Sequence, residues 1–415
     1  MSTANLAIAA GYRFAGIHCG LKAAGTPDLA LIVSRPPATA AAVFTRNRFP
    51  AAPVLCGRRQ IAAGGPVRAV LINAGNANAC TGEQGEVDLL TTAAVLASVL
   101  ECPREEVFIS STGVIGEPLP VTKILKGIEQ LESAIGAETA AGSDGLEAAA
   151  RAIMTTDKVP KLATATIEVG GERVTITGLA KGAGMIEPDM ATMLAYLLTD
   201  AGIERDLLQA MLKRVVDQSF NRITVDGDTS TNDTVALLAN GLAGGPLLEP
   251  GTPDYERFED ALTRVSIALA QAIVRDGEGA TKFVTVQVSG LADNAAAHQV
   301  ANAIATSPLV KTAIYGGDAN WGRILAAAGY SGADFQPDAA ELWITGGAQA
   351  DAYLPSLHLV SQGMPLDYDE AAATERFAQP ELLIDLKLGD GPGQTVMWTC
   401  DLSHEYVTIN GAYRT

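Results

Sequence analysis

The stretch "ATATIEVGGERVTITGLAKGAGMIEPDMATMLAYLLTD", residues Ala163 to Asp200, carries the strongest structural signal in the chain. Two segments of alternating polar and apolar residues flank Gly170 and Gly171, a dipeptide that tolerates the positive φ angles of a tight hairpin turn. The second segment runs into a glycine-rich loop, and the loop runs into an apolar strand whose first polar atom is the hydroxyl of Thr192. We therefore predict a β-hairpin that delivers this loop to the start of a buried strand.

Strand and helix signals alternate on both sides of this stretch. Apolar runs at Leu29–Ser34 and Val67–Asn73 predict strands that are buried on both faces. Helical periodicity at Leu207–Val216 and Phe258–Ile273 predicts helices, the second with Asp254 as its N-cap. The expected fold class is α/β (mixed α+β): a layered sandwich in which helices cover stacked β-sheets, with the active site between two lobes.

Two connections are predicted farther along the chain. Residues 240–254, "NGLAGGPLLEPGTPD", have the composition of a long surface connection. Near the C-terminus, "ELLIDLKL" and "TVMWTC" alternate around "GDGPGQ", which predicts a second hairpin. A chain of 415 residues exceeds the usual size of one hydrophobic core, so we expect either one large layered domain or two lobes.

Composition and charge exclude several classes of partner. The chain has 29 Lys plus Arg against 47 Asp plus Glu, a net charge of −18, which repels nucleic acids and anionic membrane surfaces. No apolar run approaches the roughly 18 residues of a membrane span, and the N-terminal residues lack a secretory signal pattern. Five scattered cysteines without a C-x-x-C pair indicate a reduced protein. We expect a cytoplasmic protein with no nucleic-acid or membrane partner.

Familiar cofactor-binding and metal-binding motifs are absent from this sequence or incomplete in it. The four histidines form no H-E-x-x-H pattern, and Val225–Asp233, "VDGDTSTND", lacks the glycine and the closing glutamate of a calcium loop. No phosphate-binding loop is present, and "GAGMIE" lacks the third glycine of a dinucleotide fingerprint. We therefore expect no metal and no cofactor.

Thr192 has two interpretations. A threonine hydroxyl needs a base, and a peptide break before Thr192 supplies one, because the new α-amino group has a pKa of about 7.7 to 8.0 and lies a few bonds from that hydroxyl. The small side chain of Ala191 lets Thr192 reach the preceding carbonyl for an N-to-O acyl shift. The alternative is a loop entering a core strand, in which Gly182 and Gly184 adopt positive φ and Thr192 is a strand former.

The segment "KGAGMIEPDMATML" resembles the cleavage and nucleophile motif of the ornithine acetyltransferase (glutamate N-acetyltransferase) family of arginine biosynthesis. Asp189 departs from the asparagine that many members carry near the cleavage point. Further segments resemble blocks of the same family in the same order, so the resemblance covers almost the whole chain: "PPATAAAVFTRNRFPAAPV", "LINAGNANACTG", "SSTGVIGEPLP", "IMTTDKVPK", "SFNRITVDGDTSTND", "GDANWGRILAAAGYSG" and "HEYVTINGAYRT".

The resemblance implies a self-cleaving enzyme with an N-terminal threonine. Its products are an alpha chain, residues 1–191, and a beta chain, residues 192–415, which stay together as two alpha and two beta chains. Thr192 takes the acetyl group from N2-acetylornithine as an ester and passes it to glutamate, giving ornithine and N-acetylglutamate by a ping-pong mechanism. The sequence leaves open whether acetyl-CoA is also a donor.

The resemblance also assigns the site residues. Thr112 and Gly113 form the oxyanion hole, although a turn would be equally consistent with these letters alone. Lys181 is the expected partner of a substrate carboxylate, and Glu278 that of a substrate ammonium group. The sequence does not decide which of Thr155 and Thr156 contacts substrate. The implied cleavage lies between Ala191 and Thr192, and the implied substrate-binding residues are Thr155, Thr156, Lys181, Thr192, Glu278, Asn410 and Thr415.

Two other functions compete with the transferase. An N-terminal threonine can pass its acyl group to water, as in self-cleaving amidohydrolases and aminopeptidases, and the sequence shows neither water exclusion nor a second amino-acid pocket. A non-catalytic binding protein with a structural loop is the third interpretation. It predicts one intact polypeptide, whereas both enzyme interpretations predict two fragments.

Overall fold

The computed structural model describes residues 6–22, 25–187, 193–348 and 354–412. The chain divides into two compact units, which confirms the two-lobe alternative: the first comprises Met1–Asn221 with Thr229–Ile273, and the second comprises Arg222–Asp228 with Val274–Thr415. Within the described ranges, no helix has both the length and the apolarity that crossing a membrane requires. All five cysteines are free thiols.

The hairpin predicted around Gly170 and Gly171 is confirmed. Strand β5 (Lys161–Val169) pairs with the antiparallel strand β6 (Glu172–Lys181). The two glycines between them have φ angles of 58° and 86°. Positive φ at both positions is what a two-residue hairpin turn requires, and glycine adopts it without a steric cost.

The sheet of the first unit has the strand order β4-β3-β2-β8-β7-β6-β5, with β1 also paired to β2. It folds over along β2, because the first half of β2 pairs with β1 and β3 while its second half pairs with β8. The register shifts between Val33 and Ala38, across two prolines that cannot donate to a ladder. The further strands are β1 (Tyr12–Ile17), β2 (Leu29–Phe44), β3 (Val67–Asn76), β4 (Val107–Val114), β7 (Leu194–Thr199) and β8 (Thr234–Ala239).

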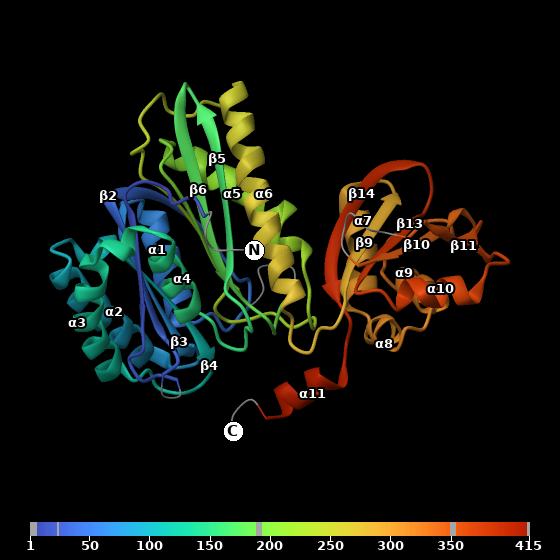
Figure 1. Ribbon diagram of the computed structural model, residues 1–415, viewed down its shortest axis with the longest axis horizontal. Coiled ribbons are helices and arrows are strands. Elements are labelled where there is room, and N and C mark those ends of the chain that lie inside the picture. The colour runs from blue at the N-terminus through green and yellow to red at the C-terminus, as the bar shows by residue number, and fades with distance from the viewer. Residues whose placement is uncertain (1–5, 23–24, 188–192, 349–353, 413–415) are drawn as a thin grey trace. The chain divides into compact units, whose positions relative to one another are not determined.

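The folded sheet makes the first unit a layered sandwich, as predicted. The inner faces of the two halves share one buried cluster that includes Ile32, Val70, Tyr196 and Leu238. Figure 1 shows α2 and α3 outside one half and α5 and α6 outside the other. The helices of this unit are α1 (Ala52–Ala63), α2 (Gly82–Val99), α3 (Val121–Gly136), α4 (Ser143–Ala152), α5 (Arg205–Gln218) and α6 (Pro253–Arg275).

The two periodic helices are confirmed as α5 and α6, but the predicted N-cap of α6 is wrong. The helix begins at Pro253, because proline at the first helical position loses no hydrogen bond. Asp254 therefore lies inside the first turn, where its Oδ2 accepts the backbone N–H of Gly170 at 2.8 Å. The hydroxyl of Thr252 accepts the amide of Tyr255 at 3.3 Å instead.

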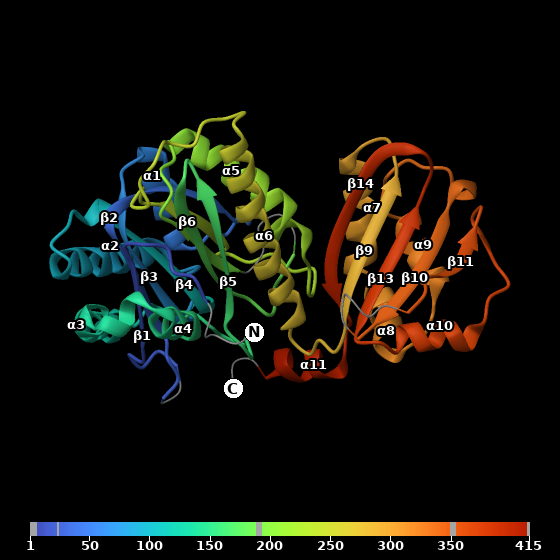
Figure 2. The same cartoon turned by 45° about the horizontal axis from the view of Figure 1, so that its top comes forward.

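The second unit has one sheet of order β12-β11-β10-β13-β9-β14, and α7 and α9 pack on it. Figure 2 shows this sheet with β9 between β13 and β14. The second predicted hairpin is therefore wrong: both strands form, but each pairs with β9. Alternating residues mark a strand without selecting its partner. The elements are α7 (Asn294–Thr306), α8 (Pro308–Gly316), α9 (Trp321–Gly329), α10 (Glu370–Phe377), α11 (His404–Gly411), β9 (Phe283–Gly290), β10 (Glu341–Gly347), β11 (Leu357–Ser361), β12 (Met364–Pro365), β13 (Glu381–Lys387) and β14 (Gly391–Cys400).

Candidate active site

Lys181 lies at the end of β6 and is only 3% exposed. Its ammonium group donates to the hydroxyl of Thr155, which follows α4, at 2.8 Å. It also donates to the hydroxyl of Thr112, near the end of β4, at 3.3 Å. The fold thus brings two of the expected site residues, Thr155 and Thr112, to the buried ammonium group of a third, Lys181.

Asp157 stabilises this cluster through hydrogen bonds, and it is not among the site residues expected from the sequence. Oδ1 accepts from Lys161 Nζ at 2.5 Å and from the backbone N–H of Gly182 at 2.7 Å. Oδ2 accepts the backbone N–H of Thr155 at 2.9 Å. Burial alone would raise the pKa of the Asp157 carboxyl, but the ammonium groups of Lys181 and Lys161 hold that pKa well below its usual range. An ionised Asp157 therefore fixes the backbone on both sides of the cluster.

A second lysine contributes to the electrostatics of this cluster. Lys22 donates from Nζ to the carbonyl oxygens of Pro27 at 2.7 Å and Met154 at 2.5 Å. Burial, together with the positive charge of Lys181, lowers the pKa of Lys22 to about 8, and the Asp28 carboxylate opposes this shift. No motif in the sequence distinguishes Lys22 from a surface lysine, because its partners are backbone carbonyl oxygens, and that of Met154 lies far along the chain.

Gly113 lies where β3 and β4 approach too closely for a side chain. Its φ angle is 129°. A Cβ atom added there would lie 2.3 Å from the carbonyl carbon of Gly75. The fold therefore requires glycine at this position, and it places that glycine directly after Thr112. The oxyanion role of Thr112 and Gly113 stays a prediction.

The second unit holds another pair of expected site residues. The side-chain amide of Asn410, on α11, donates to Glu278 Oε2 at 2.7 Å. Glu278 is 6% exposed. The fold of this unit thus joins two residues that are far apart in the sequence and that the resemblance had assigned to one site.

Thr156, which follows Thr155 after α4, is half-buried. Ala191, Thr192 and Thr415 lie outside the described residues. Their roles as cleavage point, nucleophile and substrate contact stay predictions.

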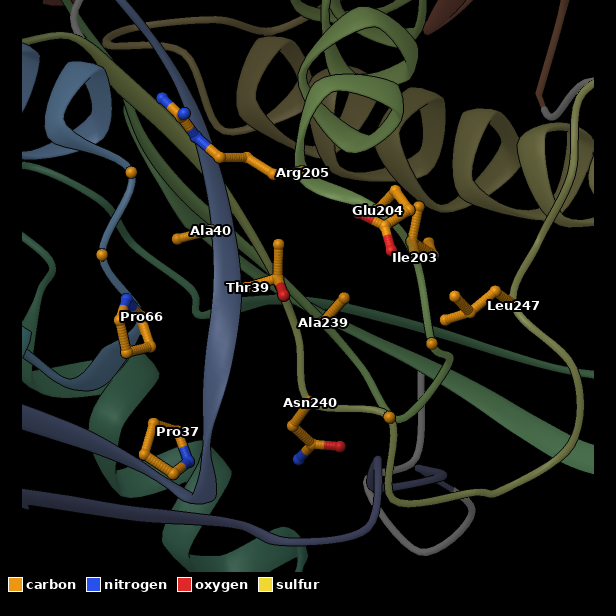
Figure 3. Close-up of a pocket in the computed structure, with 14 residues that line it drawn as sticks. Pro37, Thr39, Ala40, Pro66, Ile203, Glu204, Arg205, Ala239, Asn240 and Leu247 are labelled. Carbon is orange, nitrogen blue, oxygen red and sulfur yellow. The ribbon is translucent and has the colours of Figure 1, made fainter.

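A surface pocket of the first unit lies away from the Lys181 cluster. Figure 3 shows it beside Thr39 of β2 and around Asn240, which follows the last residue of β8. Its residues do not include any of the expected site residues. The lining consists of Pro37, Thr39, Ala40, Gly64, Gly65, Pro66, Gly202, Ile203, Glu204, Arg205, Ala239, Asn240, Gly241 and Leu247.

A layered α/β fold that gathers lysine, carboxylate and hydroxyl groups at buried strand ends is typical of enzymes that act on small polar molecules. Comparison with known proteins identifies the family within this class. The chain belongs to the ArgJ family, whose model matches residues 13–415. This membership confirms the resemblance found in the sequence blocks.

Curated relatives match over nearly their whole length. The arginine biosynthesis bifunctional protein ArgJ of Symbiobacterium thermophilum is 47% identical over 98% of this chain and 97% of its own. The protein of the same name from Geobacter sulfurreducens is 46% identical, over 98% of this chain and 99% of its own.

Solved structures of similar sequence cover part of the chain. The ArgJ crystal structure from Bacillus halodurans is 42% identical with a TM-score of 0.47, and covers 52% of this chain and 96% of the solved chain. The ornithine acetyltransferase of Mycobacterium tuberculosis, complexed with ornithine, is 39% identical with a TM-score of 0.39. It covers 45% of this chain and 96% of the solved chain.

Proposed function

We propose that this protein is a glutamate N-acetyltransferase that moves an acetyl group from N2-acetylornithine to glutamate, through an acetyl ester on Thr192. The observation that carries the proposal is the buried cluster in which Lys181 contacts Thr155 and Thr112. It joins a cation suited to a substrate carboxylate with a residue of the expected oxyanion hole. The name shared by the curated relatives, which places them in arginine biosynthesis, supports the pathway.

Chain connectivity supports Thr192 as the nucleophile of this cluster. Leu194, the first residue of β7, pairs with Lys181. Paired residues on antiparallel strands have Cα atoms about 4.5 to 5.5 Å apart, and two residues span at most about 7 Å. Thr192 lies only two residues before Leu194 in the sequence, and this short spacing supports it as the nucleophile that serves the Lys181 cluster.

The sheet topology is suited to a chain that is cut and stays assembled. Cleavage between Ala191 and Thr192 leaves β2 and β6 on the alpha chain, residues 1–191, and β7 and β8 on the beta chain, residues 192–415. In the sheet, β7 and β8 lie between β2 and β6. Both flanking ladders, β2 with β8 and β6 with β7, must break before the two chains separate.

The reaction proceeds in two acyl transfers. Thr192 Oγ1 attacks the acetyl carbonyl carbon of N-acetylornithine while the α-amino group of Thr192 takes the hydroxyl proton. Thr112 and Gly113 stabilise the oxyanion, a contribution of about 2.7 to 4 kcal/mol for one donor. The C–N bond then breaks and the ornithine nitrogen takes the proton. The amino group of glutamate attacks the ester in turn, releasing N-acetylglutamate and restoring Thr192.

The substrate contacts complete the proposal. Lys181 binds the carboxylate of each substrate, and one of Thr155 and Thr156 contacts the substrate. Glu278 binds a substrate ammonium group and Asn410 orients the Glu278 carboxylate through their hydrogen bond. Thr415 supplies a further contact, so its deletion alone should raise KM. The enzyme acts in the cytoplasm as two alpha and two beta chains, without a cofactor or metal.

One assay separates the competing functions. Purified protein is incubated with N-acetylornithine and glutamate, and acetylglutamate and acetate are both quantified. Acetylglutamate as the main product supports the transferase, whereas acetate in the presence of glutamate supports the hydrolase. A parallel assay with acetyl-CoA decides whether it is also a donor.

A denaturing gel tests whether the chain cleaves itself before Thr192. We expect two fragments for the wild type, the second beginning at Thr192, and one uncut chain for Thr192→Ala. Fully active protein that remains a single polypeptide would contradict the mechanism, and an uncut, inactive wild type would favour a binding protein.

A further inference from the structure

A polar pair directly before β8, Asn232 and Asp233, is buried in the first unit. The exposed fraction is 6% for Asn232 and 0% for Asp233. Buried polar groups are normally hydrogen-bonded, so their partners indicate what such groups hold in place. The two side chains bind two different segments, and each segment adjoins a residue of the proposed mechanism.

Asn232 holds the peptide that precedes the expected oxyanion hole. Its amide nitrogen donates to the carbonyl oxygen of Ser111 at 2.8 Å and to that of Ala77 at 2.6 Å. The Ser111 carbonyl and the Thr112 N–H belong to one planar peptide unit, so fixing the oxygen fixes the orientation of the whole unit. Asn232 thereby sets the direction in which the backbone enters Thr112.

Asp233 holds the residue that follows the proposed nucleophile. Its Oδ1 accepts the backbone N–H of Met193 at 2.8 Å. The N–H of Thr234 donates to the Met193 carbonyl at 3.1 Å, so Met193 is held on both sides. Covalent geometry places the nitrogen of Thr192 within about 4 Å of the Met193 nitrogen. The anchor therefore acts at the position next to the nucleophile.

The environment of Asp233 shows that this anchor is not a chance surface contact. Burial raises the pKa of its carboxyl well above the usual range, against the opposing effects of the Met193 N–H, the Thr45 hydroxyl and the charge of Lys181. A carboxyl group is costly to bury, which argues for a function beyond packing.

We propose that Asn232 and Asp233 are a joint positioning device for the acetyl-transfer site. Asn232 orients the oxyanion-hole backbone, and Asp233 anchors the start of the nucleophile strand. Because the two are consecutive, one peptide bond links the contact to Met193 with the contact to Ser111. This inference rests on the proposed function, since it concerns how those two residues are aligned.

The test measures acetyl transfer by the full-length protein and expresses kcat per cleaved molecule, with cleavage quantified on a gel. We expect Asp233→Ala and Asn232→Asp to lower kcat about 100-fold, the effect of misplacing reacting groups by about 1 Å. KM should stay within about twofold, because the substrate contacts are elsewhere. Asp233→Asn keeps an oxygen that accepts the Met193 N–H, so its kcat should stay within about threefold of the wild type.

The chain offers matched controls at the opposite ends of the same strands. Asp200, after β7, is 3% exposed and accepts the N–H of Thr175 at 2.7 Å. Asn240, after β8, donates to the Ala10 carbonyl at 2.8 Å. Asp200→Ala and Asn240→Asp should lower Tm while leaving kcat per cleaved molecule unchanged.

Three outcomes are decisive. Loss of Tm in Asp233→Ala and Asn232→Asp with kcat within about threefold of the wild type overturns the positioning role. If Asp233→Ala does not fold, the isosteric Asn232→Asp decides, since it replaces the donor to Ser111 by a carboxylate oxygen. A wild type that transfers no acetyl group overturns the proposed function, and this inference with it.

Discussion

The ammonium nitrogen of Lys181 lies 2.8 Å from the hydroxyl oxygen of Thr155, a contact between the end of β6 and the turn after α4. The same nitrogen is 3.3 Å from the hydroxyl oxygen of Thr112. One buried cation therefore connects three segments of the first unit: β6, the turn after α4, and β4.

Lys181→Ala should raise KM for both N-acetylornithine and glutamate about 10- to 100-fold, since a hydrogen bond to a charged group contributes about 1.5 to 3 kcal/mol. Steady-state kinetics with each substrate varied checks this. Lys126, exposed on α3, is the matched control, and its replacement by alanine should leave KM unchanged. An unaltered KM in Lys181→Ala would remove this residue from substrate binding.

Asp157→Asn should destabilise the protein by about 3 to 5 kcal/mol at pH 7, because it leaves the buried Lys161 ammonium without its counter-charge. The pKa of Asp157 is lowered on folding, so its contribution is full above the unfolded value of about 3.9 and is lost as pH falls through the folded value. The difference between the denaturant midpoints of wild type and variant should be full at pH 7 and should begin to narrow only below about pH 4. Equal midpoints at pH 7 would contradict the role of Asp157.

Gly113→Ala should lower kcat by about 10²- to 10³-fold, the effect of losing one oxyanion donor, because the added Cβ meets Gly75 at 2.3 Å and displaces the β4 backbone. Gly116 is the control, since it also has a positive φ, 83°, but nothing lies within 4 Å of a Cβ there. Both variants should lose stability, and only Gly113→Ala should lose turnover per folded molecule. Equal kcat values for the two would argue against an oxyanion hole at Gly113.

The pH profile should report the α-amino group of Thr192 as the base. With a free amine near its reference value, kcat/KM should rise through roughly pH 7 to 8. The rise is expected in this direction because only the deprotonated amine accepts the hydroxyl proton. A profile that is flat from pH 6 to 9 would exclude the amine as the base.

Glu278 and Asn410 should act as a coupled pair, because the Asn410 amide donates to Glu278 Oε2 at 2.7 Å. We expect Glu278→Gln and Asn410→Ala each to raise KM, and the double variant to be no worse than the more affected single variant. A double-mutant cycle measures this coupling, which typically amounts to about 0.5 to 3 kcal/mol for residues in contact. Strictly additive effects would show that the hydrogen bond does not matter for substrate.

The hairpin prediction that is correct depends on residues close together in the sequence, whereas the hairpin prediction that is wrong depends on a distant strand. The hairpin at Gly170 and Gly171 could be predicted because its turn and register depend on adjacent residues. The hairpin predicted between β13 and β14 is wrong because β9, from a distant part of the sequence, pairs with both strands. Local patterns identify a strand, but the partner depends on which distant strand buries the matching face.

The candidate site shows the same division. The sequence blocks identified Lys181, Thr112 and Thr155, while Asp157 and the pair Asn232–Asp233 lay in the quoted blocks without an assigned role. Asn232 binds Ser111, 121 residues away. Only the folded chain can show such a contact, because an asparagine or aspartate is an ordinary turn residue until its partner is known.

By itself, the sequence determined the family, the alternation of helices and strands, and the chemical types of the expected site residues. The tertiary structure alone decided that the first sheet folds over at β2, so that the ends of β4 and β6 and the start of β8 meet around buried charges. The physical reason is that hydrogen bonding and charge pairing in a buried site depend on distance in space. Two residues with no local relation in the sequence become partners when burial removes the water that would otherwise solvate them.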